Sequence, residues 1–373
     1  MIACSGSDTF GEMTEPAKHI LVSVLDWGLG HATRSVPVIQ SLIARGCKVS
    51  LAGHGDSLLL LKMEFPQLQT YEITSYRVAY SASIPFMTKI FMQLPKFLLA
   101  IRREHRQIEK LCLDKSIDAI ISDNRYGCWS NSIPSILITH QLNLILPSSF
   151  RWLSGLINFF NHKLIKKFDV CWVPDYSDNR VTGTLSQSGN LRVRFIGMLS
   201  RMKPEKIDLE ADTILAILSG PEPQRQILEK ILIKEMSGRQ ERCTLVRGLP
   251  NDETTKQGGQ TIYNHLNGDQ LSKLIQKSST VITRSGYSSI MDLTMINAKR
   301  VILIPTPGQT EQEYLAQELD RRKVALYQAQ ANVDLKGAIS RLNEYRGFIK
   351  SASGSNLLAE AIENMLKMEK DYL

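Results

Sequence analysis

The sequence contains no run of eighteen apolar residues, so it predicts no transmembrane helix. Its six cysteines are scattered without a Cys-x-x-Cys pair or a metal-ligand spacing, which favours reduced thiols in a cytoplasmic protein. The sequence also lacks an Asp-x-Asp motif, so nothing indicates a chelated divalent cation. We therefore predict that the protein holds no metal and no cofactor.

The overall composition is that of a globular protein, with 43% apolar and 22% charged residues. A chain of 373 residues is long enough for two domains, each with its own core. Residues 1–18 lack the charged-then-apolar pattern of a signal peptide, and we expect them to form a disordered lead-in.

Short apolar runs alternate with stretches of helical periodicity from His19 onward, which is typical of a parallel sheet covered by helices on both faces. The alternation pauses in the polar stretch Gly197–Asp212 and then resumes at a predicted strand, Thr213–Leu218. The pattern predicts two doubly wound, Rossmann-like α/β domains facing a cleft. We assign residues 19–200 to the first domain, 201–211 to a linker and 212–353 to the second domain.

The net charge of +8 is concentrated in two segments. Residues 84–110 hold six Lys or Arg against two Glu, and residues 148–167 hold four Lys or Arg and no acid. Both segments are rich in apolar residues, so they suggest contact with an anionic membrane surface, peripherally at its inner face. The alternative is a pair of core-packing helices with solvated basic faces. No nucleic-acid motif accompanies the charge, so we expect no nucleic-acid partner.

Two strand-to-helix turns of the second half predict its binding site. Arg284-Ser285-Gly286 follows the strand Thr280–Thr283, and a second turn follows Val301–Ile304. Ligands bind at the carboxyl ends of strands in open α/β sheets, and backbone N–H groups at a helix start suit a diphosphate. Ser288 and Asp292 share one helix face, which places the carboxylate where ribose hydroxyls could donate to it.

The first half has a turn of its own, Trp27-Gly28-Leu29-Gly30-His31, between a strand and a helix. At a helix N-terminus the dipole disfavours the imidazolium, so a neutral His31 can act as general base toward a hydroxyl. Asp123, at the end of the strand Ile117–Ser122, is the rival base. The alternatives are structural: His31 bonded to its turn, and Asp123 capping a helix or pairing with Arg125.

Thr283–Asp292 and Pro305–Tyr314, together with Gly28–Arg34, resemble the motifs of MurG-like glycosyltransferases, the family 28 enzymes with the two-domain GT-B fold. The resemblance spans roughly residues 19–370. It implies that a C-terminal helix, within residues 354–373, packs back on the first domain. It also implies an inverting transfer.

The resemblance implies further contacts. Gln312 and Glu313 would lie at the donor's sugar hydroxyls, and Arg201 would face the diphosphate. Glu313 also has a structural alternative, because Thr310–Glu313 fits a capping box. In the stretch from His140 to Asn143, Gln141 stands where the family has an acid, which favours hydrogen bonding to the acceptor over proton transfer. The nucleobase would lie near Tyr263–Leu266.

We predict acceptor contacts from these patterns at Gly30, Arg34, Asn124, Arg125, His140, Gln141 and Asn143. We predict donor contacts at Arg201, Ser219, Gly220, Gln224, Arg225, His265, Leu266, Arg284, Ser285, Gly286, Tyr287, Ser288, Asp292, Gln309, Gln312 and Glu313.

The expected activity is transfer of a sugar, with N-acetylglucosamine favoured by analogy, from a UDP-sugar to an acceptor hydroxyl. The basic, apolar stretch Pro85–Arg106 suggests a lipid-linked acceptor. A UDP-sugar 2-epimerase and a non-catalytic nucleotide-sugar or lipid-binding protein remain as alternatives.

Overall fold

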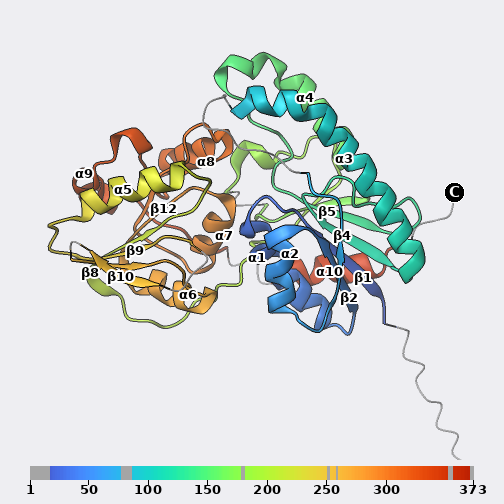
Figure 1. Cartoon of the computed structure of the whole chain (residues 1–373), viewed down its shortest axis with the longest axis horizontal. Coiled ribbons are helices and arrows are strands. Elements are labelled where there is room, and N and C mark those ends of the chain that lie inside the picture. Colours follow the sequence, from blue (N-terminus) through green and yellow to red (C-terminus); the bar gives the residue numbers. More distant parts are fainter. Residues whose placement is uncertain are drawn as a thin grey trace, which may run out of the picture.

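The computed structural model describes residues 17–76, 86–177, 181–249, 253–257, 259–351 and 356–369. Most of the predicted lead-in, residue Pro85 and both ends of the segment 354–373 therefore lie outside the described residues. The described chain forms two α/β halves, which Figure 1 shows in blue to green and in yellow to orange.

The first half is built on a seven-stranded parallel sheet in the order β3-β2-β1-β4-β5-β6-β7. Its strands are β1 (His19–Val24), β2 (Lys48–Gly53), β3 (Gln69–Glu72), β4 (Ala119–Asp123), β5 (Ser135–Ile138), β6 (Val170–Val173) and β7 (Val193–Phe195). Its helices are α1 (Leu29–Ile43), α2 (Gly55–Glu64), α3 (Phe86–Lys115) and α4 (Ser154–Ile165), with 3-10 turns at Ser148–Leu153 and Gly183–Ser186. Every residue of β1, β4 and β5 is buried, as the prediction of a sheet covered on both faces requires.

The second half has its own seven-stranded sheet in the order β10-β11-β9-β8-β12-β13-β14, in which only the β10–β11 pairing is antiparallel among the described pairings. Its strands are β8 (Glu210–Ile217), β9 (Arg242–Val246), β10 (Thr254–Gln257), β11 (Gln260–Tyr263), β12 (Ser278–Thr283), β13 (Val301–Leu303) and β14 (Leu326–Tyr327). Its helices are α5 (Gln224–Met236), α6 (Gly268–Lys277), α7 (Tyr287–Met295), α8 (Thr310–Arg321) and α9 (Leu335–Arg341), with 3-10 turns at Gln330–Asn332 and Leu342–Glu344. These two sheets confirm the predicted doubly wound α/β fold.

The chain returns to the first half through its last described helix, α10 (Leu357–Leu366), which packs against α1. Lys18 donates to the backbone carbonyl of Leu366, and Arg45 lies 3.4 Å from the Glu363 carboxylate. In Figure 1 the red α10 accordingly lies beside β1 and not beside the sheet of the second half.

Strand β8 begins at Glu210, earlier than the predicted strand Thr213–Leu218 and within the stretch expected to be polar linker. Glu210 pairs with Ser278 in the ladder, and its carboxylate lies 3.0 Å from Arg242. The ladder is irregular before Thr280, where Asp212 has a φ of 52°. A bulge of this kind lets a polar segment join a strand without apolar alternation, which is why the sequence pattern did not reveal it.

Candidate functional site

The two halves meet where helix α1 approaches helix α7 (Figure 1). Ser288, in the first turn of α7, donates to the backbone carbonyl of Gly30 over 3.2 Å. A Cβ atom on Gly30 would lie 2.6 Å from the Ser288 hydroxyl oxygen, so only glycine permits this approach without a shift. Gly30, predicted to contact the acceptor, therefore lies at the junction of the two halves.

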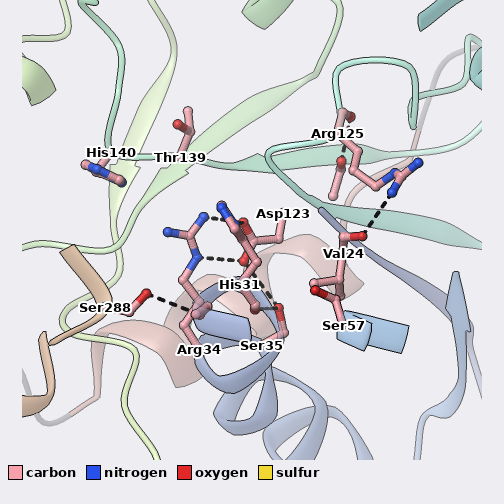
Figure 2. Close-up of polar contacts among 12 residues, drawn as sticks. Val24, His31, Arg34, Ser35, Ser57, Asp123, Arg125, Thr139, His140 and Ser288 are labelled. Atoms are coloured by element: carbon pink, nitrogen blue, oxygen red, sulfur yellow. Dashed lines mark hydrogen bonds and ion pairs between the residues drawn. The ribbon is translucent and has the colours of Figure 1, made fainter. Parts of the chain in front are cut away.

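Three side chains from the start of α1 converge on the carboxylate of Asp123, at the end of β4 (Figure 2). His31 Nδ1 lies 2.9 Å from Asp123 Oδ1, and Arg34 donates through Nε over 2.6 Å and also through Nη2. Ser35 donates over 3.3 Å. The helix starts after Gly28, whose φ of 97° makes the tight turn that directs these side chains toward the strand end.

Burial and charge set the protonation of this cluster. Burial by itself raises the pKa of Asp123, but Arg34 and then His31 oppose it, and the net effect holds that pKa well below its usual range. Burial, and then the charge of Arg34, lowers the pKa of His31 although Asp123 opposes the shift. Near neutral pH the cluster therefore combines an ionised Asp123 with a neutral His31.

The second half adds Glu311, from the first turn of α8, to the same region. His140 Nε2 lies 2.8 Å from the Glu311 carboxylate, and Gln141 donates to its other oxygen. The His140 ring stacks on Tyr287 of α7 with 3.9 Å between ring centroids. Burial raises the pKa of Glu311, but His140 and Arg34 lower it below its usual value, so its charge is retained. Of the predicted acceptor residues, Gly30, Arg34, His140 and Gln141 thus gather near His31.

Glu311 was not predicted from the sequence, whereas its neighbours Gln312 and Glu313 were. The capping box proposed for Thr310 and Glu313 is wrong, because α8 has Gln309 as its N-cap residue and no side-chain cap bond. Thr310 donates instead to the backbone carbonyl of Ile145 in the first half, over 2.8 Å. Glu313 accepts from the Gly308 backbone N–H over 2.9 Å. An acid in the first turn of a helix that starts at the carboxyl edge of the sheet was the available signal for Glu311.

Arg284 is fully buried and binds backbone. It donates to the carbonyls of Ile304, Pro305 and Gln224 over 2.8 to 3.1 Å, and burial lowers its pKa to about 10. These bonds hold the loop after β13 to the start of α5. Ser285 donates to the Gln312 carbonyl over 2.8 Å, so it fixes α8 beside α7.

The N-terminus of α7 itself is uncapped by side chains, with Gly286 as its N-cap residue. Among the described residues, no side chain accepts from its first N–H groups in place of a ligand. The turn therefore retains the backbone donors that a diphosphate would use.

Asp292 lies one turn into α7 and accepts a 2.5 Å hydrogen bond from the hydroxyl of Ser200. Burial raises the pKa of Asp292 to about 6, although the Ser200 bond and the charge of Arg201 act against it. Arg201 also lies against the start of α6, because a Cβ on Gly268 would be 2.9 Å from its Nε. Asp292 and Arg201 thus share one region beside the α7 turn.

Two other residues predicted to contact the acceptor, Arg125 and Asn143, are bonded to other parts of the first half. Arg125 is fully buried, with Nε 2.5 Å from Glu104, and in Figure 2 it points away from the cluster toward Val24. Asn143 donates to the Gln187 carbonyl over 2.8 Å. Among the described residues Asn124 Oδ1 is buried without a partner. Arg125 and Asn143 thus stabilise the first half.

In the second half, Arg225 is held by two acids, Glu222 at 2.5 Å and Glu229 at 2.7 Å. Gln224 starts α5 and accepts from Gln330 over 2.8 Å. The remaining predicted donor ligands, in the loop after β8 and the segment after β11, are the exposed Ser219, Gly220 and His265 and the half-buried Leu266. Gln312 donates to Gln309 over 2.5 Å and accepts from the Thr306 backbone over 2.9 Å.

Within the described ranges, no group of three His, Cys, Asp or Glu side chains is arranged to hold a metal ion. Among the same residues, no helix combines the length and apolar character needed to cross a bilayer.

Comparisons with known proteins give matches for part of the sequence and for the fold. Residues 235–366 match the glycosyltransferase family 28 C-terminal domain. An uncharacterized glycosyltransferase of Methanosarcina acetivorans is 24% identical over 317 residues, which cover 79% of this chain and 81% of that protein.

Solved structures extend the likeness to the whole fold. MurG of Acinetobacter baumannii superposes with a TM-score of 0.59 at 11% identity, over 95% of this chain and 100% of that one. The Phytolacca americana enzyme UGT2, solved with UDP-2-fluoroglucose and pterostilbene, superposes with a TM-score of 0.60 at 14% identity, over 94% of this chain and 100% of that one. These likenesses establish the two-domain GT-B architecture.

Proposed function

We propose that this chain, a GT-B glycosyltransferase of the family 28 type, transfers a sugar from a UDP-sugar to an acceptor hydroxyl with inversion and without a metal ion. The observation that carries the proposal is the His31–Asp123 pair, which lies beside the uncapped start of α7 where the two halves meet. A base from one half and a phosphate-binding helix from the other are what a direct displacement needs.

His31 is the general base in this proposal. Its Nδ1 faces Asp123, so the bond fixes the tautomer that leaves Nε2 unprotonated and able to take a proton from an acceptor hydroxyl. Asp123 is a poor base, because its pKa is held low and both its oxygens accept hydrogen bonds from α1. Its role is to orient the imidazole and stabilise the imidazolium that forms.

The donor side uses the second half. The N–H groups that start α7 would bind the diphosphate and stabilise the charge that develops on the leaving group. Arg201, whose charge acts on Asp292, is the cation we assign to the diphosphate, because Arg284 is committed to backbone carbonyls. Asp292 would accept from the ribose hydroxyls in its ionised form. Glu311, next to His31 and Arg34, would accept from a hydroxyl of the transferred sugar.

The test combines donor binding with turnover. UDP should raise the melting temperature of the wild-type protein, and His31→Ala should keep this shift while losing UDP release in the presence of hydroxyl acceptors. A UDP-sugar incubated with the enzyme alone should remain unchanged. Its conversion to another UDP-sugar would establish the epimerase instead, and failure of UDP to stabilise the protein would refute the donor site.

We also propose that the first half, which would bind the acceptor, contacts an anionic membrane surface. Its contact surface is the apolar side of the segment 148–165, where four large side chains are at least half exposed: Trp152, Leu156, Phe159 and Phe160. The four basic residues of this stretch and its flank have no acid among them, and each contributes about 1 kcal/mol near an anionic surface. Lipid-facing apolar groups with a basic rim are typical of interfacial helices.

Vesicle sedimentation tests this surface. Wild-type protein should sediment with phosphatidylglycerol vesicles at low salt, and Phe159→Ser with Phe160→Ser should reduce the bound fraction. The matched control is Leu113→Ser. Leu113 is 80% exposed, and it lies in the last turn of α3, outside the segment 148–165. Equal binding by all three proteins would refute the proposed contact.

A further inference from the structure

A cavity of about 790 Å³ lies at the carboxyl edge of the first sheet, the edge at which β4 ends in Asp123. Strand ends β2 and β3 contribute His54 and Glu72, the loop after β3 contributes residues 73–76, and α3 forms the opposite wall. Its volume is in the range of sites that enclose a medium-sized organic ligand. None of the residues assigned above to donor, acceptor or base lines it.

One wall of the cavity is aromatic. Tyr76 and Phe97 meet edge to face with 4.9 Å between ring centroids. Trp27 packs on both, at 6.3 Å from Tyr76 and 6.2 Å from Phe97, and remains 40% exposed. Trp27 lies between β1 and α1, four residues before His31.

Helix α3, which carries Phe97, also brings positive charge to the cavity. Lys96 and Arg103 line the cavity from one face of α3, seven residues apart. Among the described residues, no ion pair involves either of them, whereas the acid of the lining, Glu72, lies 3.0 Å from His54. The described part of the lining therefore offers two unpaired cations and one acid, Glu72, that is bonded to His54.

The walls are held in place before any ligand arrives. The Tyr76 hydroxyl donates a hydrogen bond to the fully buried carboxylate of Glu104. The same carboxylate accepts a hydrogen bond from Arg125 Nε over 2.5 Å. The Thr74 backbone and hydroxyl both donate to Gln107, over 2.9 and 2.7 Å. These bonds fix the loop after β3 to α3, so the site is preorganised and loses little free energy to ordering.

From this arrangement we infer that the cavity binds the acceptor, and that the acceptor is an amphiphile whose apolar body lies on Trp27, Tyr76 and Phe97 and whose anionic group lies at Lys96 and Arg103. The identification of this ligand as the acceptor rests on the proposed function. The recognition chemistry does not depend on it: an apolar surface next to two unpaired cations selects an apolar molecule with a phosphate or carboxylate.

Farnesyl phosphate and the uncharged farnesol are suitable probes, with binding to the full chain measured by calorimetry. Arg103→Gln should weaken farnesyl phosphate binding about tenfold, as loss of a charge-assisted contact predicts, and should leave farnesol and UDP binding unchanged. Lys96→Gln should act in the same direction. Arg102→Gln, an exposed neighbour outside the lining, is the matched control and should stay within about twofold of wild type.

The outcomes separate the two proposals. Equal losses in Arg103→Gln and Arg102→Gln would show non-specific charge attraction and overturn the cavity site, as would farnesol binding as tightly as farnesyl phosphate. If farnesyl phosphate binds as expected but UDP does not bind the wild-type protein, the glycosyltransfer proposal fails while the cavity site stands. If UDP binds and none of the variants matters, only the cavity site fails.

Discussion

Donor affinity should depend on pH through Asp292. Burial places its pKa at about 6, so at pH 5 about one-tenth of the unliganded protein carries the carboxylate that would accept from ribose hydroxyls. If only this form binds fully, affinity for a UDP-sugar should fall about tenfold between pH 7.5 and pH 5. A UDP-sugar is the appropriate ligand, because UDP itself has a terminal phosphate that titrates in this range.

The raised pKa of Asp292 also affects the stability of the fold. This effect has the opposite pH dependence to the effect on donor affinity. The folded protein holds the Asp292 proton more tightly than the unfolded chain, whose carboxyl has a pKa of 3.8. Its stabilising contribution is therefore present in acid and is lost as pH rises through about 6. The ionised carboxylate costs the unliganded protein up to about 3 kcal/mol at pH 7. Asp292→Asn should remove that cost, and should raise the melting temperature at pH 7.5 but not at pH 4.

The assay is isothermal titration with UDP-N-acetylglucosamine at pH 5, 6 and 7.5, for wild type and Asp292→Asn. The variant retains every other titrating group, so the difference between the two profiles isolates Asp292. The Ser200 hydroxyl can still donate to the Asn oxygen, which preserves the local geometry. A wild-type affinity that is flat with pH, or a variant that binds as tightly as wild type at pH 7.5, would refute the assignment of Asp292 to the ribose.

Four further predictions concern the junction. Asp123→Asn should lower the rate of UDP release by about 10²- to 10⁴-fold, because His31 loses its orienting carboxylate, while UDP affinity stays within about twofold; a normal rate would remove Asp123 from the mechanism. Wild-type turnover should fall in acid as His31 becomes protonated, with a midpoint below 6.5, and a midpoint above it would contradict a neutral base. Gly30→Ala should lower turnover about tenfold by forcing the halves apart, and Ser288→Ala in the same chain should restore part of it. Glu311→Gln should weaken binding of a UDP-sugar but not of UDP, as competition titrations can show; equal loss for both ligands would place Glu311 away from the sugar.

Much of the fold could be predicted from the sequence, since buried parallel strands are continuous apolar runs. The strand at His19, the turn at Gly28 and the turn at Gly286 all carry strong local signals, and the structure has each of them. The hairpin β10–β11 was not predicted, because its polar strands, Thr254–Gln257 and Gln260–Tyr263, have neither an apolar run nor clear alternation.

The site was harder to predict, because the direction in which a side chain points and the group that it contacts depend on the tertiary structure. Arg284 stands in the turn predicted to bind phosphate, yet its guanidinium donates to three backbone carbonyls that are distant in sequence. Glu311 and Glu313 are two residues apart on α8, and only the position of the first half decides that Glu311 meets His140. Helical periodicity places these two residues on different faces, but it does not say which face meets the first half.

The return of α10 to the first half constrains how the protein can move. The described chain passes from the first half to the second between β7 and β8, and it is back on the first half at α10. A single covalent passage would let one half swivel in any direction, whereas two passages leave rotation about the line that joins them as the easy motion. Each opening would then carry Glu311 away from His140 along one arc, and each closing would return it to the same register.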